Sequence, residues 1–377
     1  MEKRVWIELH EDRLVANYRR IAERVRPAKV LCVLKANAYG LGVDNVSMAL
    51  YGAGCRHFGV ADPFEADWLR RAFPDCHVQI LSGILPGEIS DMVAAGVVLP
   101  AMDLATARLV SRAARRLGRK ARVHFKVDSG MGRLGVPVGA AAGVLAKVAS
   151  LPSIEVEGAF SHLATAGSPG DPYALGQISS FKAFLRDARN AGVGFKMVHI
   201  AASDAINNYP QCARRPFNMV RAGIDLYGSF DPNGRRELGL ECVFSLKTRV
   251  IQVRTLPAGT SLGYLRTWRL ARRSRIATIS AGYADGLPLA LSNRGHVVIG
   301  GCLCPLVGRI SMDYAAADVS AAGDVRAGDE VVCLGTVGGH SIMPDDWAAV
   351  KGTHAYDIIC SLGGRVERRT EPLRLID

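Results

Sequence analysis

The stretch 30-VLCVLKANAYGLG-42 joins an apolar strand pattern to a reactive side chain. The run up to Leu34 has the short, β-branched composition of a buried strand, and it ends directly on Lys35. A loop follows that closes on Gly40 and Gly42. A lysine at the end of a core strand is either a charge held in water or a nucleophile whose amine is tuned by its surroundings. The rest of the chain decides between these two interpretations.

The same strand-then-helix pattern repeats from residue 30 to about residue 228. Between the strands lie segments such as 104-LATARLVSRAARRLG-118, in which apolar residues recur near every third or fourth position. Eight such units are typical of a (β/α)8 barrel, whereas a doubly wound sheet usually has fewer strands. The predicted strands are VLCVL (30–34), HFGVA (57–61), HVQIL (77–81), VVLPA (97–101), RVHFKV (122–127), VEGAF (156–160), KMVHI (196–200) and VRAGI (220–224).

Beyond Gly228 the sequence changes character. Runs such as 245-SLKTRVIQV-253 and 329-DEVVCLG-335 are separated by Gly and Pro turns, which predicts a mainly β domain. We therefore predict an α/β protein, with a TIM-like (β/α)8 barrel over residues 11–236 and a mainly β domain over 237–377. The opening residues 1–10 are predicted to add a strand to the second domain.

Composition narrows the class of protein. Of the 377 residues 49% are hydrophobic, yet no apolar run reaches the ~18 residues of a membrane span, and the N-terminus lacks the apolar region of a signal peptide. We therefore expect a cytoplasmic protein with no membrane partner. The net charge of +12 comes from dispersed basic residues, so no nucleic-acid partner is expected. The nine cysteines form only one close pair, Cys302 and Cys304, which favours reduced thiols and predicts no metal site.

Reactive residues follow several of the predicted barrel strands, at the ends where barrel enzymes place their chemistry. Paired acids for a glycosidase, a metal-ligand cluster and a nucleophile elbow are all missing from this set. A lysine with several phosphate-type donors fits a Schiff base to an aldehyde cofactor that carries a phosphate, and pyridoxal phosphate is the obvious candidate. The residues are Lys35, Tyr39, Lys126, Arg133, His162, His199, Ser203 and Arg221.

Seven motifs, in order along nearly the whole chain, resemble the alanine racemase family. The resemblance implies a fold-type III enzyme, in which a barrel binds pyridoxal 5'-phosphate and a β domain follows. One lysine at a strand end is weak evidence, but seven motifs in sequence are specific. The motifs are 35-KANAYGLG-42, 128-DSGMGRLG-135, 158-GAFSHLATA-166, 221-RAGIDLYG-228, 263-GYLRTW-268, 282-GYADG-286 and 308-GRISMD-313.

The resemblance implies two catalytic bases, Lys35, which also carries the cofactor, and Tyr264. Inverting a stereocentre requires that a proton leaves one face of the substrate and returns on the other, so two bases must flank it. In the family the arginine at position 221 faces the pyridine nitrogen, and the histidine at position 162 links it toward the tyrosine. Because arginine does not give up its proton, the ring nitrogen stays unprotonated, and we infer less leakage into transamination.

The resemblance also assigns the remaining site residues. It implies that Arg133 and the main chain of Met312 bind the substrate carboxylate, and that Lys126 falls where some members carry a carbamylated lysine. Because Tyr264 belongs to the predicted β domain and Lys35 to the barrel, it implies a homodimer whose active sites are shared between subunits. The positions that match phosphate binding are Tyr39, Ser203, Gly223 and Ile224.

We therefore predict a racemase that interconverts L-alanine and D-alanine. The family's usual role implies D-alanine biosynthesis, but the catabolism of D-alanine needs the same chemistry, and no residue distinguishes the two roles. The alternative is an amino-acid racemase of wider range, for serine or basic amino acids. A decarboxylase on the same barrel would normally bring a catalytic cysteine in family-like context, and a non-catalytic cofactor carrier would not need Tyr264, so both are less favoured. Four departures from the family's usual pattern bear on cofactor affinity and pocket width: Leu41, Ala202, Leu265 and Gly364.

Overall fold

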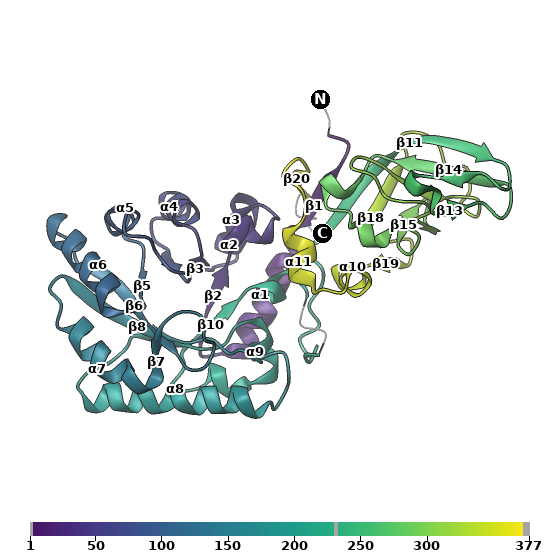
Figure 1. The fold of residues 1–377 in the computed structure, drawn as a ribbon. Coiled ribbons are helices and arrows are strands. Elements are labelled where there is room, and N and C mark those ends of the chain that lie inside the picture. Colours follow the sequence, from purple (N-terminus) through teal and green to yellow (C-terminus); the bar gives the residue numbers. More distant parts are fainter. Residues whose placement is uncertain (1–2, 230–232, 372–377) are drawn as a thin grey trace, which may run out of the picture.

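The computed structural model describes residues 3–229 and 233–371, which form a barrel and a β-rich domain side by side (Figure 1). The barrel strands run parallel in two arcs, ordered β10-β2-β3-β4 and β5-β6-β8-β9. Isolated parallel bridges between Gln79 and Val98 and between Ala202 and Arg221 join the arcs into a closed barrel, which confirms the predicted fold. The strands are β2 (Lys29–Val33), β3 (His57–Val60), β4 (His77–Ile80), β5 (Leu99–Ala101), β6 (Ala121–Asp128), the short β7 (Val136–Pro137), β8 (Ile154–Phe160), β9 (Met197–His199) and β10 (Met219–Ala222).

Aspartates begin three of the helices that surround the barrel. The side chains of Asp62, Asp103 and Asp171 accept hydrogen bonds from backbone N–H groups of the first helical turn, and prolines follow two of them. These caps fix where each strand-to-helix loop ends. The helices are α1 (Glu11–Val25), α2 (Lys35–Tyr39), α3 (Val43–Gly52), α4 (Pro63–Ala72), α5 (Ile89–Ala94), α6 (Leu104–Arg116), α7 (Val138–Ala149), α8 (Pro172–Asn190) and α9 (Ser203–Asn208), with the 3-10 turns η1 (Pro210–Ala213) and η2 (Ile224–Tyr227).

The second domain is built around a nine-stranded sheet. Its long strand β11 (Phe244–Leu256) pairs with the amino-terminal strand β1 (Trp6–His10), which also pairs in parallel with the carboxyl-terminal strand β20 (Glu367–Glu371). The domain is mainly β, as predicted. Its other elements are β12 (Ser261–Leu262), η3 (Tyr264–Arg266), β13 (Trp268–Arg269), β14 (Ser274–Ile279), η4 (Tyr283–Asp285), η5 (Leu289–Leu291), β15 (His296–Ile299), β16 (Cys302–Pro305), β17 (Ala315–Asp318), β18 (Glu330–Val337), β19 (His340–Ile342), α10 (Pro344–Lys351) and α11 (Ala355–Cys360).

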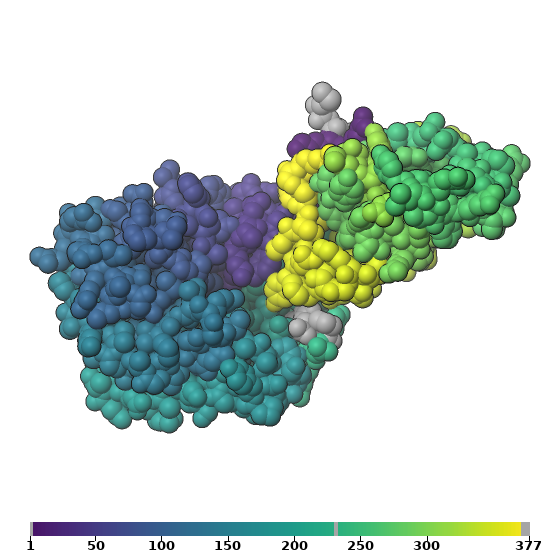
Figure 2. Space-filling view, in the orientation of Figure 1, coloured from purple at the N-terminus to yellow at the C-terminus, as the bar shows by residue number. Residues whose placement is uncertain are grey.

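The end of the chain returns to the barrel. Figure 2 shows the carboxyl-terminal segment, in yellow, between the barrel and the rest of the β domain. The Arg368 guanidinium donates a hydrogen bond to the Gly40 carbonyl at 3.0 Å, and a side chain on Gly40 would approach the Ile359 carbonyl to 3.1 Å. This segment therefore packs directly on the loop that follows Lys35. Within the described residues, no helix is both long enough and apolar enough to span a bilayer.

Candidate active site

A cavity of about 740 Å³ opens at the carboxyl ends of the barrel strands. Eight of the residues that the sequence analysis assigned to the cofactor or the substrate line it. Two further lining residues, His354 and Tyr356, come from the start of α11, so the β domain supplies part of the wall. Ile224 lies next to Gly223 and is fully buried. The eight residues are Lys35, Tyr39, Lys126, Arg133, His162, Ser203, Arg221 and Gly223.

Lys35 begins a left-handed turn. Residues 36–39 all have positive φ, between 52° and 58°, a conformation that non-glycine residues rarely adopt. The backbone N–H of Asn37 donates to Glu65 Oε1 at 2.7 Å, and its side-chain Oδ1 accepts from the Val43 N–H at 2.8 Å. These bonds hold the turn, so the lysine amine faces the cavity. Burial, followed by the nearby charge of Arg133, lowers the pKa of Lys35, which favours the neutral amine that a nucleophile needs.

Arg221 is held by four acceptors at the base of the cavity. It donates to His199 Nδ1 at 2.8 Å, to His162 Nδ1 at 2.9 Å, and to the carbonyls of Ser161 and Ile200 at 2.8 and 2.9 Å. Burial lowers the pKa of Arg221 to about 9, which leaves the guanidinium protonated at neutral pH. Burial and the charge of Arg221 lower the pKa of His162 as well, so this imidazole is neutral and accepts through Nδ1.

Arg221 also sets the tautomers of a buried chain of side chains, of which the sequence analysis singled out only His199. Because the guanidinium only donates, His199 accepts at Nδ1 and carries its proton on Nε2, 2.9 Å from His124 Nδ1. His124 then carries its proton on Nε2, which points toward Glu157 Oε2 at 3.7 Å. Glu157 also meets His77 Nε2 at 3.3 Å. The group formed by Glu157, His124 and His77 has the residue types of a metal site, but His124 offers it an N–H and no lone pair.

A phosphate-sized cradle lies around Gly223. A Cβ on Gly223 would come within 2.5 Å of Tyr39 Oη and 3.5 Å of Ser203 Oγ. The missing side chain therefore leaves space in which two hydroxyl groups and backbone N–H groups can surround an anion. Together with the lysine amine for the aldehyde, this cradle fits pyridoxal phosphate.

Arg133 reaches the cavity from the loop 128-DSGMGRLG-135. Asp128 Oδ1 closes this loop by accepting hydrogen bonds from the backbone N–H groups of residues 130–132, at 2.8 to 3.1 Å. Gly135 has φ of 113°, and a Cβ there would lie 2.9 Å from the Lys126 carbonyl, so the tight return of the loop requires glycine. Arg133 itself is exposed at the cavity wall, where its guanidinium can meet a ligand.

Lys126 is a buried amine in the same wall. Its side chain is 6% exposed, and its Nζ lies 4.1 Å from the centre of the Phe160 ring. Burial, followed by the charges of Arg221 and Arg133, lowers the pKa of Lys126 to about 7. A substantial fraction of this amine is therefore neutral near physiological pH, which is unusual for lysine.

Tyr264 and Met312 lie on the β domain, and neither lines the cavity within this chain. The Tyr264 side chain is 70% exposed and Met312 is 53% exposed. Tyr264 follows Gly263, which has φ of 67°, and precedes Leu265, which has φ of 60° and is 80% exposed. The family often has glycine at position 265. In this chain leucine occupies the position, and its backbone is left-handed. One chain gathers the cofactor residues but leaves the predicted second base on its open surface.

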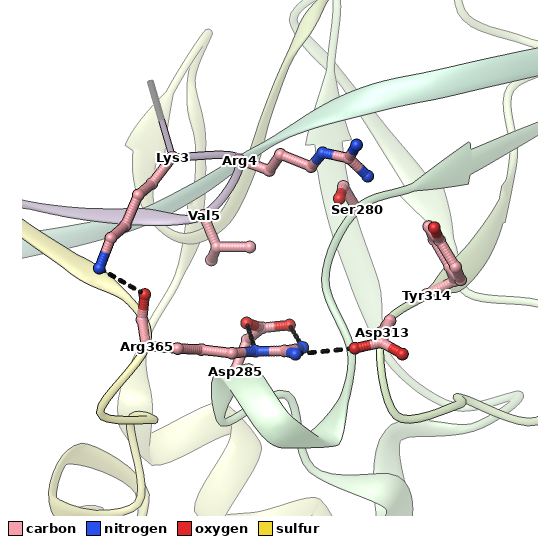
Figure 3. A pocket seen from close by; sticks show the side chains of 8 residues that line it. All are labelled: Lys3, Arg4, Val5, Ser280, Asp285, Asp313, Tyr314 and Arg365. Carbon is pink, nitrogen blue, oxygen red and sulfur yellow. Dashed lines mark hydrogen bonds and ion pairs between the residues drawn. The ribbon is translucent and has the colours of Figure 1, made fainter. Parts of the chain in front are cut away.

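A smaller hollow of about 320 Å³ is lined by side chains that hold the loop carrying Met312 (Figure 3). Arg365 donates to both carboxylate oxygens of Asp285, at 2.7 and 2.9 Å, and to Asp313 at 2.8 Å. The backbone of Gly363 is packed against Ala284 so closely that a Cβ would lie 2.2 Å from its carbonyl oxygen. The carboxyl-terminal segment therefore ties the 282-GYADG-286 and 308-GRISMD-313 motifs together.

The other departures lie in different environments. Leu41 is fully buried in the core behind the Lys35 turn, and Ala202 precedes α9 and bridges to Arg221. Gly364 is exposed, and a Cβ there would meet nothing within 4 Å.

His354 and Tyr356 were missed because their segment lies about 120 residues beyond the barrel in sequence. His124 had a usable signal, because it stands two residues before Lys126 on β6 and so faces the same side of the strand.

The fold and the cavity are those of a barrel enzyme that uses pyridoxal phosphate. Family models for the N-terminal and C-terminal domains of alanine racemase match residues 9–231 and 243–370. The alanine racemase of Symbiobacterium thermophilum is 37% identical over 364 residues, which cover 96% of each chain. This chain therefore belongs to the alanine racemase family.

Solved structures agree with this assignment. The crystal structure of alanine racemase from the D-cycloserine producer Streptomyces lavendulae matches with a TM-score of 0.90 and 32% identity, covering 98% of both chains. The structure of alanine racemase from Bartonella henselae with covalently bound pyridoxal phosphate matches with a TM-score of 0.87 and 30% identity, covering 98% of this chain and all of that one (100%). The two-domain arrangement is therefore shared over the full length.

Proposed function

We propose that this protein interconverts L-alanine and D-alanine by a two-base mechanism that uses pyridoxal phosphate. The observation that carries the proposal is the cavity itself, in which a lysine amine of lowered pKa, a phosphate cradle and a protonated Arg221 lie together. Tyr39, Ser203, Gly223 and Ile224 would hold the phosphate, and Arg221 would meet the ring nitrogen. When bound, the cofactor withdraws electrons from the substrate Cα and so makes its hydrogen acidic.

The chain's own residues then remove a proton from one face of the substrate and deliver another proton to the opposite face. Lys35 exchanges the proton on one face, and its lowered pKa makes the release of that proton easier than for an ordinary lysine. Tyr264 serves the opposite face. Arg133 binds the substrate carboxylate through its planar fork, which fixes the Cα hydrogen in line with one base or the other.

We propose a homodimer in which each site takes Tyr264 and Met312 from the second copy. The support is that both side chains are exposed on the β domain, outside the cavity of their own chain. A second copy that covers this surface would remove exposed side chains such as Leu265 and Met312 from water and complete the set of two bases. A monomer is expected to load cofactor without racemising alanine.

We propose that Lys126 carries a carbamate formed with CO2. The neutral amine is the reactive form, and burial together with Arg221 and Arg133 keeps the pKa of this lysine at about 7. Carbamylation would replace a buried cation with an anion between two arginines. Arg133 would then be oriented by attraction.

We also propose a cytoplasmic location, because all nine cysteines are free and disulfides are rare in reducing compartments.

The test is a chiral-chromatography time course of the purified protein with pyridoxal phosphate and, in separate reactions, L-alanine, L-serine, L-lysine and L-arginine. We expect alanine to be racemised far faster than the others. Comparable rates for serine or a basic amino acid would replace the alanine assignment with a broader racemase and leave the two-base mechanism in place. Absence of racemisation with all four would overturn the function.

A further inference from the structure

Asp225 is a buried carboxylate behind the phosphate cradle. It is fully buried in η2 and does not line the cavity. Its Oδ1 accepts hydrogen bonds from Ser203 Oγ at 2.8 Å, the Gly223 N–H at 2.8 Å and the Leu226 N–H at 3.0 Å. Its Oδ2 has no hydrogen-bond partner among the described residues. One oxygen is thus crowded with donors and the other has none.

These bonds use the donors that a phosphate in the cradle would need. The Ser203 hydroxyl gives its proton to Asp225, away from the cavity, and therefore presents lone pairs where an anion would sit. The Gly223 N–H is shared between Ser203 Oγ, at 3.0 Å, and Asp225 Oδ1. An ionised Asp225 and a phosphate would compete for the same donors, and two close anions would also repel each other.

A proton on Asp225 removes this conflict. The protonated carboxyl can donate to Ser203 Oγ, which frees the Ser203 hydroxyl proton to turn toward the cavity. We propose that Asp225 takes up one proton from solvent when the cofactor phosphate docks, and that this proton sets the Ser203 hydroxyl as a phosphate donor. The only covalent change on the protein is the new O–H bond of Asp225, whose proton comes from solvent. The inference rests on the proposed function only in assigning the phosphate to the Ser203 and Gly223 cradle.

The surroundings of Asp225 make it the group that titrates near neutral pH. Burial raises the pKa of Asp225 to about 7, against the lowering effect of its hydrogen bonds, and Asp204 on α9 raises it further. The other titratable groups that face it are Cys32 on β2, Tyr39 on α2 and Tyr227 on η2, and burial raises the pKa of each, so all three stay neutral. Phosphate binding that requires the protonated form weakens as pH rises above about 7, by up to tenfold per pH unit.

The experiment counts protons during cofactor loading. Full-length protein freed of cofactor is titrated with pyridoxal 5'-phosphate by calorimetry at pH 8, in buffers of different ionisation enthalpy, and visible absorbance reports loading independently. Pyridoxal, which lacks the phosphate, is the matched ligand. We expect the phosphorylated form to take up close to one more proton than pyridoxal does in the wild-type protein. Asp225→Asn should abolish this extra uptake, and the affinity of that variant should no longer fall between pH 7 and pH 9.

Each outcome decides a separate question. Asp91→Asn, on the exposed surface of α5, removes one carboxylate elsewhere and should behave like the wild-type protein. Equal proton uptake in wild type and Asp225→Asn would overturn the inference. If Asp225→Asn fails to fold, equal uptake with pyridoxal and its phosphate in the wild-type protein would overturn it as well. Failure of the protein to develop visible absorbance with either ligand would instead overturn the proposed function.

Discussion

Lys35 and Tyr264 both stand beside left-handed backbone, but one faces an enclosed cavity and the other open solvent. The Lys35 turn has four consecutive non-glycine residues with positive φ, braced by Glu65 and by its own Asn37 side chain. The Tyr264 turn has two such residues, Leu265 and Arg266, and Arg266 donates a hydrogen bond to Ser261 on the short strand β12 before the turn. The barrel half of the proposed site is prearranged within the chain, whereas Tyr264, in the other half, is exposed on the β domain.

The difference shows where backbone strain can be tolerated. A left-handed residue costs about 1–2 kcal/mol, so the Lys35 turn stores several kcal/mol that its hydrogen bonds and core contacts must offset. Such a turn suits a residue that must stay fixed while the cofactor binds and leaves. In the homodimer proposed above, the second subunit would set the exposed Tyr264 turn in place.

Removing the amine from the prearranged half should have the largest effect. Lys35→Ala is expected to abolish visible absorbance with pyridoxal phosphate and to lower racemisation by roughly 10⁴-fold, because both the attachment point and one base are lost. Lys29→Ala, at the exposed opposite end of the same strand, is the matched control and should keep both. Wild-type turnover in Lys35→Ala would show that Lys35 is neither the attachment point of the cofactor nor a catalytic base.

Tyr264→Phe tests whether the second half comes from another subunit. This variant should keep its visible absorbance and lose racemisation by roughly 10²–10⁴-fold. Mixing it with Lys35→Ala under conditions of subunit exchange should restore activity to about a quarter of wild type, since half of the dimers would be mixed and each would hold one intact site. Chiral chromatography of the mixture measures this. No recovery despite verified exchange would place both bases within one chain.

Lys126 offers a pH-dependent test of the barrel half of the proposed site. Its pKa of about 7 means that the neutral amine, and with it the carbamate, should become more abundant as pH rises through 7 and should be lost below it. We expect intact mass spectrometry under native conditions to show one added CO2 at pH 8 with bicarbonate, and none in Lys126→Ala. That variant should raise the KM for alanine about tenfold, because Arg133 loses its orienting anion. An unchanged KM would remove Lys126 from substrate binding.

The contrast between the two halves also explains what the sequence could predict. The eight barrel strands and the residues at their ends follow from local pattern, because each strand end delivers its side chain to the same rim. Asp225, on the turn η2, acts through its hydrogen bond from Ser203 on α9, and Glu157, on β8, meets His77 on β4; no local pattern contains such contacts. The direction of the Ser203 hydroxyl proton depends on a carboxylate that is 22 residues away and fully buried. Such polar contacts depend on the closed barrel, and a sequence motif cannot specify them.

The smallest expected effect concerns the brace of the Lys35 turn. Glu65→Ala removes the acceptor of the Asn37 N–H and should lower the free energy of unfolding by about 1–2 kcal/mol, because a backbone donor in a strained turn loses its partner. Glu65→Gln keeps an acceptor oxygen and should lose less. Urea unfolding measures both, and the affinity for pyridoxal phosphate should fall in the same order. If the two variants unfold alike, the turn is held by its core contacts and not by this bond, and the prearrangement of Lys35 lies in the packing of Leu41 and the carboxyl-terminal segment behind it.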